Sequence, residues 1–425
     1  MIYNYSYYNI ILKESQDFVY IYNSFSGALC KLEKDIYDLI LNNEINDNVK
    51  CKYFDELYNQ GFIKPKDLNE FNKIFLTERI NILSSNNNKL SIIITPTLAC
   101  NLNCEYCFEK DNRRNIAADD KTIIDIADFI LKQLTLNIKE VHITWFGGEP
   151  LLAYNKIKLF NTYFKEKILC LNIKYSASMI TNGILLDEEK VKFMVEKCNL
   201  KNIQITIDGT QEVYCKRKQA TIKQYTQLLS NIKCAVNYLK VSIRLNCDGE
   251  NYENLKEVAK YLINMCSKSN NLSIYLAKLV DYTTCQGTQF FNQLEFDKKK
   301  IEFNKYLSNL LDRPYRKRVV KYRPTFCGLY KLKNFVVGPT GELYKCEHHV
   351  GQKSREIGHI KYGYNYSNFM MEFLNNFPDE SCIKCKLYPL CLGGCPAQKL
   401  DIPNNENCYI SEYYIKSILN YYLIS

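Results

Sequence analysis

The 425-residue sequence lacks the features that would place it in a membrane, outside the cell or on nucleic acid. Its longest apolar runs, such as 91–96 and 141–146, have the length of a strand and fall far short of the roughly 20 residues that a membrane-spanning helix needs. The first residues do not follow the basic, apolar and small-residue order of a signal peptide. No arginine-rich tract or aromatic and basic motif of a nucleic-acid-binding module is present. We therefore expect a cytoplasmic protein with neither a membrane nor a nucleic acid as partner.

Cysteine, in contrast, is abundant, with 19 residues in the chain. In a reducing cytosol these cysteines are better explained as metal ligands or buried small residues than as disulfides. The net charge of +10 comes mostly from lysines scattered along helix-like segments, which permits an acidic partner without requiring one. The length suggests two or three domains.

Three of the cysteines, Cys100, Cys104 and Cys107, form a CxxxCxxC run directly after the strand-like segment 91–96. A four-iron cubane normally takes four thiolates, so three closely spaced cysteines would leave one iron free to bind another molecule. An open metal position is typical of a reactive site. A structural zinc site and three core cysteines are the alternatives. Zinc, however, prefers four ligands, usually in separated CxxC pairs, and core cysteines have no reason to cluster in a loop.

Strand-like and helix-like segments alternate after this point, which predicts a parallel sheet with right-handed crossovers and outer helices. Ligands bind at the carboxyl ends of the strands in such folds. The expected strands are 91–96, 140–146, 174–181, 202–208, 240–246 and 272–277, and the expected helices include 120–134, 187–197, 224–238 and 252–266.

The second expected strand is followed by Gly147, Gly148, Glu149 and Pro150. Glycines let backbone approach a ligand closely, although this run alone could be a simple turn. Together with the cysteine triplet and its place after the first strand, the run makes the chain resemble the radical S-adenosylmethionine enzymes. The resemblance implies an α/β fold with a partial (β/α)6 barrel over residues 86–311. It also implies a 4Fe-4S cluster on the triplet, whose open iron is chelated by the amino and carboxylate groups of S-adenosylmethionine.

In the resembled family, one electron from the cluster splits the sulfonium, and the resulting 5′-deoxyadenosyl radical takes a hydrogen atom from the substrate. An external donor such as flavodoxin or ferredoxin would supply that electron.

The same resemblance assigns further residues to S-adenosylmethionine. Its amino group would be bound by Gly147, Gly148 and Glu149, and Phe108 would lie beside S-adenosylmethionine. Its carboxylate would accept two hydrogen bonds from Arg217. Asn246 would contact the ribose. Tyr214 and Cys215 stand where the family often has a histidine and an aspartate before the arginine. A surface arginine and a turn-capping asparagine are the alternatives for Arg217 and Asn246.

Seven more cysteines follow a basic linker, 312–323, and their order resembles that of the SPASM domain, here residues 312–425. The resemblance implies two auxiliary 4Fe-4S clusters, and therefore three clusters in all. The outer cluster would be ligated by Cys382, Cys385, Cys391 and Cys408, and the inner one by Cys327, Cys346 and Cys395. Zinc is the alternative for the block from Cys382 to Cys395.

The inner set has three cysteines, so its open iron could bind a substrate thiolate, His348 or His349. Glu347 stands where maturases of anaerobic sulfatases carry an aspartate base, and a solvated glutamate is the alternative. The remaining cysteines, such as Cys170, Cys198, Cys234 and Cys266, are expected in the core, and Cys285 could be a spare ligand.

Residues 1–85 read as strand-like at 3–12 and 18–22 and helical at 33–41 and 53–60, a small winged-helix-like α+β unit. This order resembles the PqqD-like recognition domain of enzymes that modify ribosomal peptides, where a leader peptide adds a strand to a sheet edge. A docking or stabilising domain is the alternative.

The sequence therefore predicts a radical S-adenosylmethionine oxidoreductase that modifies a ribosomal precursor peptide with a leader. The expected product is a thioether crosslink from a cysteine sulfur to carbon, although a carbon–carbon link would use the same residues. The alternatives are an anaerobic sulfatase-maturing enzyme, which makes formylglycine, and a non-catalytic metal-binding interaction module. The sequence identifies neither the peptide nor the residue attacked.

Overall fold

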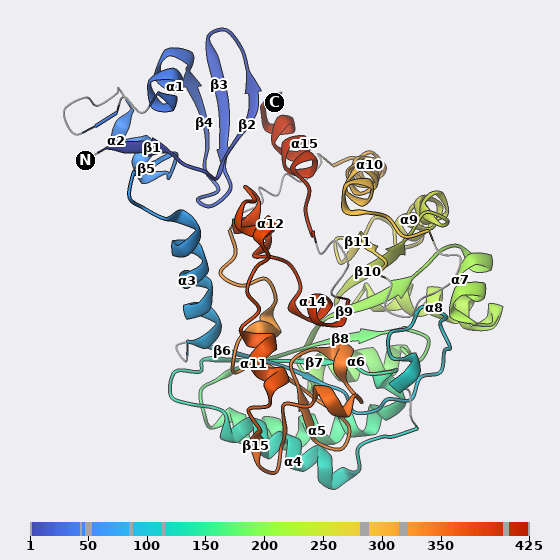
Figure 1. The fold of residues 1–425 in the computed structure, drawn as a ribbon. Helices are drawn as coiled ribbons and strands as arrows, with labels where there is room; N and C mark the ends of the chain where they lie inside the picture. The colour runs from blue at the N-terminus through green and yellow to red at the C-terminus, as the bar shows by residue number, and fades with distance from the viewer. Residues whose placement is uncertain are drawn as a thin grey trace.

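The structure is a computed structural model that describes residues 2–42, 45–46, 53–84, 88–112, 115–280, 289–313, 322–402 and 408–423 (Figure 1). Cys285, suggested as a spare ligand, lies outside these residues. No helix in the described part of the chain is both long and apolar enough to cross a bilayer.

The centre of the molecule is a parallel sheet whose six strands follow one another in chain order. These strands are β6 (Lys89–Ile94), β7 (Glu140–Trp145), β8 (Lys174–Thr181), β9 (Leu200–Ile207), β10 (Lys240–Cys247) and β11 (Leu272–Lys278). Each corresponds to a predicted strand, and β8 has the predicted bounds. The predicted α/β fold with a partial barrel is therefore confirmed.

Amphipathic helices cover this sheet. In α4 (Asp120–Lys132) the buried residues Ile123, Ile126, Ala127 and Ile130 recur with helical spacing, and Asp119 caps the first turn by accepting a hydrogen bond from the Thr122 amide. The other helices that join or follow the six strands are α5 (Tyr154–Leu169), α6 (Glu188–Lys197), α7 (Gln211–Lys218), α8 (Ile222–Ala235), α9 (Tyr252–Met265) and α10 (Gln293–Leu311). Short 3-10 turns lie at η1 (Lys110–Asn112) and η2 (Pro150–Ala153).

The cysteine-rich segment continues the same sheet beyond β6, which the sequence did not predict. Strand β12 (Phe335–Val337) pairs in parallel with β6, and β13 (Glu342–Tyr344), β14 (Gly358–His359) and β15 (Gly363–Tyr364) follow in antiparallel order. The remaining elements are η3 (Gly328–Tyr330), η4 (Glu347–His349), η5 (Lys353–Arg355), α11 (Asn368–Leu374), α12 (Glu380–Ile383), α13 (Tyr388–Cys391), α14 (Pro396–Asp401) and α15 (Glu412–Leu423).

The N-terminal unit contains a three-stranded antiparallel sheet, a two-stranded sheet and two short helices. The larger sheet has β2 (Asn9–Glu14), β3 (Phe18–Asn23) and β4 (Leu29–Glu33), the smaller pairs β1 (Tyr3–Tyr5) with β5 (Ile63–Pro65), and the helices are α1 (Lys34–Leu41) and α2 (Phe54–Asn59). The prediction of one strand over 3–12 was wrong. The chain turns between β1 and β2, where Ser6 bonds Glu70 and the buried Asn9 bonds Asn23.

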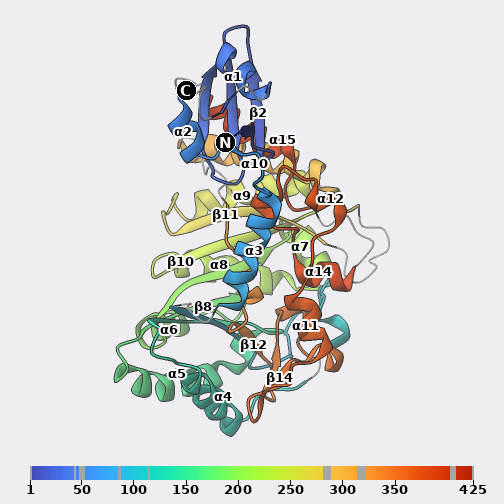
Figure 2. The same ribbon diagram turned by 60° about the vertical axis from the view of Figure 1, so that its left-hand side comes forward.

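Helix α3 (Glu70–Leu83) runs from the N-terminal unit to the central sheet, as both views show (Figures 1 and 2). Its Arg79 donates hydrogen bonds to the Leu374 carbonyl at 2.7 Å and the Tyr330 hydroxyl at 2.8 Å. Apolar residues of β2 and β3 also pack against α15, through Ile10, Tyr22, Ile415 and Leu419. Both α3 and the N-terminal sheet thus contact the cysteine-rich segment.

The isolated cysteines divide between core and surface. Cys198 and Cys266 are buried, as predicted, and Cys234 is partly buried. Cys170 is exposed, so its assignment to the core was wrong. It caps the end of α5.

Candidate functional site

The cysteine triplet lies in the loop after β6, where the carboxyl ends of the neighbouring strands meet it. Cys104 is 9% exposed, and Cys100 and Cys107 are partly buried. Asn182, directly after β8, reaches the loop, because its side-chain nitrogen lies 4.0 Å from the Cys100 sulfur and 2.7 Å from the Asn101 side-chain oxygen. The predicted convergence of strand ends on this loop is present.

The two glycines after β7 pack against the backbone that leads into Cys100. A Cβ added to Gly148 would lie 2.6 Å from the Leu98 carbonyl oxygen and closer still to that of Ala99, and one added to Gly147 would lie 3.0 Å from Thr95 Cγ2. The Glu149 amide donates to the Ala99 carbonyl at 2.8 Å. The structure shows that the two glycines allow two loops to touch, and their close approach to a ligand stays a prediction.

Glu149 is fully buried beneath the triplet loop and accepts three hydrogen bonds. The donors are the Thr181 hydroxyl at 2.7 Å, the Asn182 amide at 2.8 Å and the Leu151 amide at 3.0 Å. Burial raises the pKa of Glu149, and the three hydrogen bonds oppose that rise. A carboxylate has about four lone-pair positions, so one further donor can be accommodated. Its role toward an amino group stays a prediction.

Arg217, at the end of α7, is 14% exposed and donates a 2.6 Å hydrogen bond to Asp248, which directly follows β10. The alternative of a surface arginine is therefore wrong. Burial alone would lower the pKa of Arg217, but the bond to Asp248 raises it. Among the described residues its Nε has no hydrogen-bond partner, so part of the guanidinium fork is not used by the protein.

Tyr106, inside the triplet, joins the loop to two strand ends. Its hydroxyl donates to Asp208, directly after β9, and accepts from the Asn246 side chain at 3.4 Å. Asn246 also accepts from Arg244 at 2.9 Å. Sequence analysis named Asn246 but missed Tyr106, Asp208 and Asp248. The position of both aspartates directly after parallel strands was a signal that could have found them.

Phe108 connects the triplet loop to the cysteine-rich segment. Its ring stacks on His348, with centroids 3.8 Å apart and planes at 8°, and lies parallel to Phe146 at 6.4 Å. Burial lowers the pKa of His348, which favours a neutral ring. The neighbouring His349 is fully buried, and its Nε2 lies 2.8 Å from Asp401. This second suggested iron ligand therefore has one of its two ring nitrogens engaged.

The cysteines assigned to the inner cluster are electrostatic neighbours. Burial raises the pKa of Cys346 well above its usual range, and negative charge on Glu347, Cys395 and Cys327 raises it further. The pKa of Cys327 is raised to about 11, mainly by burial and then by Glu347. The Cys346 sulfur lies 3.9 Å from the Glu347 carboxylate, so Glu347 borders this group.

The cysteines assigned to the outer cluster form a second group. Burial raises the pKa of Cys391 to about 12, and charge on Cys385, Cys382 and Cys408 raises it further. Such thiols resist ionisation on their own, whereas metal binding stabilises the thiolate. Any metal that binds thiolates would supply this stabilisation, so the assignment of the two groups to iron–sulfur clusters stays a prediction. Among the described residues, no three His, Cys, Asp or Glu side chains are arranged to hold a single metal ion.

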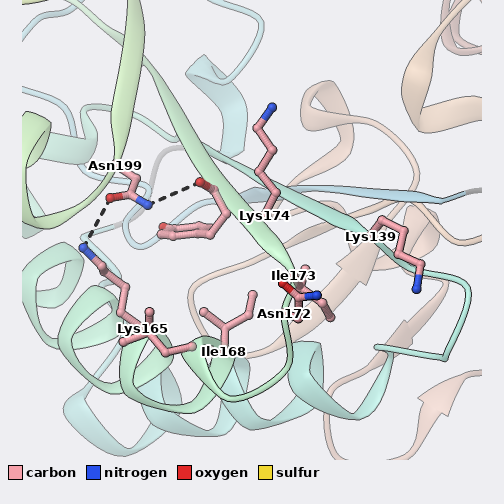
Figure 3. A pocket seen from close by; sticks show the side chains of 9 residues that line it. Lys139, Lys165, Ile168, Asn172, Ile173, Lys174 and Asn199 are labelled. Atoms are coloured by element: carbon pink, nitrogen blue, oxygen red, sulfur yellow. Dashed lines mark hydrogen bonds between the residues drawn. The ribbon is translucent and has the colours of Figure 1, made fainter.

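A separate cavity of about 390 Å³ lies at the opposite end of the sheet, near the first residues of β8 (Figure 3). Lys139, Lys165 and Lys174 line it, and Lys165 donates to the Asn199 side chain at 3.2 Å. The cavity is not part of the candidate site, because the cysteine triplet lies at the carboxyl ends of the strands.

Comparison with protein-family models matches residues 94–262 to the radical SAM superfamily. The chain is 27% identical over 284 residues to the radical SAM cyclopropyl synthase TigE of Paramaledivibacter caminithermalis. This match covers 58% of each protein and therefore less than two thirds of that relative. It is 26% identical over 356 residues to a cysteine-type anaerobic sulfatase-maturating enzyme of Clostridium novyi, covering 75% of this chain and 91% of that one.

Two solved structures share the fold. The enzyme anSMEcpe with bound AdoMet is 20% identical, with a TM-score of 0.57 over 79% of this chain and 96% of that one. Streptococcus suis SuiB bound to its precursor peptide SuiA is 15% identical, with a TM-score of 0.55 over 97% of this chain and 99% of that one. Residues 94–262 thus match the radical SAM superfamily, and the matched segment lies within the partial α/β barrel.

Proposed function

We propose that the chain is a cytoplasmic radical S-adenosylmethionine maturase that modifies a ribosomally made precursor peptide. The observation that carries this proposal is the N-terminal sheet, which packs on the cysteine-rich segment and has one edge without a strand partner among the described residues. SuiB, whose structure contains a precursor peptide, shares the fold along nearly the whole chain, the N-terminal unit included. In this reading residues 1–85 recognise the leader, 86–311 form the barrel and 312–425 form the SPASM domain.

Strand β4 offers the edge that a leader needs. It pairs with β3 on one side and, among the described residues, with no strand on the other. Hydrogen bonds join Asn23 to Ala28 and Lys34 to Asp17 at the two ends of this ladder. In an antiparallel ladder, residue pairs that are joined by hydrogen bonds alternate with pairs that are not. Ala28 and Lys34 belong to bonded pairs, so the peptide groups of Leu29 and Lys31 point away from β3. An extended leader can therefore add a strand here.

The opposite edge of this sheet is formed by β2, which packs against the cysteine-rich segment. Strand β2 contacts α15, and Lys386 donates to the Asn9 carbonyl at 3.2 Å. The hydroxyls of Ser24 and Tyr7 donate to the carbonyls of Lys386 and Lys384, next to Cys385. These contacts favour β4 as the leader edge, because they cover β2 and hold the N-terminal unit against the outer cysteine group.

The assigned residues have distinct roles in this proposal. Cys100, Cys104 and Cys107 would hold the cluster that, with S-adenosylmethionine, supplies one-electron chemistry for hydrogen-atom abstraction. Glu149 and Arg217 would orient the amino and carboxylate groups of S-adenosylmethionine, and the Phe108–His348 stack would exclude water.

In the cysteine-rich segment, the Cys327, Cys346 and Cys395 group and the Cys382, Cys385, Cys391 and Cys408 group would hold two auxiliary clusters. A flavodoxin or ferredoxin would donate electrons. Glu347 would accept the proton that a substrate thiol releases when a thioether forms.

The leader edge can be tested with one pair of substitutions. Lys31→Pro removes an outward amide while proline remains tolerated on an edge strand, and Lys31→Ala keeps the amide. The probe is the peptide translated from a short open reading frame that is sought beside the gene, and its binding to the full chain is measured by fluorescence anisotropy. We expect weaker binding for Lys31→Pro alone. Equal binding by both variants and the wild type would remove the support for this edge.

The reaction is tested by anaerobic incubation of the same precursor with the full chain, S-adenosylmethionine and dithionite. A thioether or a carbon–carbon crosslink removes two hydrogens from the peptide, and fragmentation around cysteine separates the two. An unchanged precursor mass would contradict both. Failure to cleave S-adenosylmethionine would favour a non-catalytic metal-binding module.

Sulfatase maturation is the second candidate, favoured by the match to 91% of the Clostridium novyi enzyme. A cysteine-containing sulfatase peptide would then acquire the aldehyde of formylglycine, with equal rates for the wild type and Lys31→Pro. A point substitution is preferable to deletion of residues 1–85, because deletion would expose the apolar Ile415 and Leu419 on α15.

A further inference from the structure

A buried lysine lies beside the cysteine triplet. Lys218, the last residue of α7, is 5% exposed, and its ammonium lies 3.3 Å from the Asp208 carboxylate and 5.2 Å from the centre of the Tyr106 ring. Asp208 is fully buried and also accepts the Tyr106 hydroxyl. A cation with this degree of burial is costly unless nearby groups compensate it.

The triplet loop is built on the end of the same helix. The Asn103 amide donates to the Lys218 carbonyl at 3.3 Å, and the Glu105 amide donates to the Arg217 carbonyl at 3.4 Å. The Asn103 side chain donates to that of Gln219 at 2.8 Å. The last carbonyls of a helix lack partners within it, so the loop satisfies groups that would otherwise be orphaned. Cys104 lies between the two anchored amides.

The charge of Lys218 is maintained by its surroundings. Burial alone would lower the pKa of Lys218, but Asp208, followed by Tyr106, Cys104 and Tyr214, raises it well above the usual range. The interaction takes place in a poorly hydrated part of the protein, where screening is weak.

We propose that Lys218 is a positioning residue that places a fixed positive charge against Tyr106, inside the triplet loop, and thereby sets the reduction potential of the cluster held by the triplet. This inference rests on the proposed assignment of an iron–sulfur cluster to that triplet. One-electron reduction adds negative charge, and a nearby cation stabilises the reduced state more than the oxidised state. Asp208 has the opposite effect, because its carboxylate opposes the added charge while it holds the lysine.

The test measures the midpoint potential of the paramagnetic signal that changes when S-adenosylmethionine is added to the full chain. Dithionite titration is applied to the wild type, Lys218→Met, Lys218→Arg and Asp208→Asn. We expect a more negative potential for Lys218→Met, a more positive one for Asp208→Asn and no change for Lys218→Arg. Opposite shifts from the two members of one ion pair cannot come from simple loosening of the loop.

Lys256→Met is the matched control, because Lys256 is also a partly buried lysine whose partners, Glu253 and Glu302, lie on the outer helices. It should leave the potential unchanged. If Lys218→Met does not accumulate, Asp208→Asn and Lys218→Arg decide the question. Equal potentials in all variants, shifts of the same sign, or loss of the signal in Lys218→Arg would overturn the inference. A wild-type chain without such a signal would instead overturn the cluster assignment itself.

Discussion

The contact between Gly148 and the loop before Cys100 gives a sharp prediction for Gly148→Ala. The added methyl would lie 2.6 Å from the Leu98 carbonyl oxygen and closer still to that of Ala99, well inside the roughly 3.5 Å at which non-bonded heavy atoms attract. Both neighbours are backbone atoms that cannot rotate away. The 97–99 backbone must therefore move, and the cysteine triplet that follows it must move as well.

The expected loss in the free energy of unfolding has two contributions. Overpacking costs about 1–3 kcal/mol, and two hydrogen bonds, Gly148 amide to Thr97 carbonyl and Glu149 amide to Ala99 carbonyl, contribute about 1 kcal/mol each. A loss of about 3–5 kcal/mol is a large part of the roughly 5–15 kcal/mol that stabilises a typical domain. We expect a clear fall in melting temperature and loss of the iron bound by the triplet.

Gly328→Ala is the matched control, because Gly328 directly follows Cys327 but a Cβ added there meets no atom within 4 Å. Both variants are purified anaerobically, and iron per chain and thermal unfolding are measured. Gly328→Ala should behave as the wild type. If Gly148→Ala also kept the wild-type iron content and melting temperature, the close contact would not position the triplet.

Three further predictions concern the cysteine-rich segment and its neighbours. Cys391→Ser should lower bound iron by about the four atoms of one cubane, whereas the exposed Cys170→Ser should not, as iron analysis can show. Lys345→Met should cost roughly 2–4 kcal/mol in urea unfolding, because the buried ammonium donates to two main-chain carbonyls at 2.6 Å, while the exposed Lys361→Met should cost little. Burial raises the pKa of Asp297, so its stabilisation relative to Asp297→Asn is complete below the unfolded pKa and is lost as pH rises through the folded value. The melting temperature of the wild type minus that of the variant should therefore decrease from pH 4 to pH 8, and a constant difference would contradict the assignment.

The barrel strands could be predicted because parallel strands covered on both faces tend to contain apolar runs, such as Ile92–Ile94 in β6. Strand β12 could not, because Phe335–Val337 is short and its partner Ile92 lies far away in the sequence. The single strand expected over 3–12 failed because polar residues, with Asn9 and Ser6 among them, form a buried corner that apolar periodicity does not reveal.

The cysteine triplet was singled out by its spacing, whereas the two later cysteine groups were assigned by resemblance, and the ligation of all three stays a prediction. The bond from Arg217 to Asp248 and the bond from Tyr106 to Asp208 depend on which strand ends become neighbours in space. The role of Gly148 was also beyond the sequence, because it depends on the path of another loop.

The pairing of β12 with β6 has a consequence for the order in which the chain acquires its structure. During synthesis, β6 leaves the ribosome long before Phe335–Val337, and the apolar surface of β2 emerges long before Ile415 and Leu419. Domains generally fold from the amino end as they emerge, and unpaired edges of this kind invite aggregation. The β6 edge and the apolar surface of β2 therefore stay uncovered until the later residues have been synthesised. We expect that a high yield requires chaperone assistance during translation.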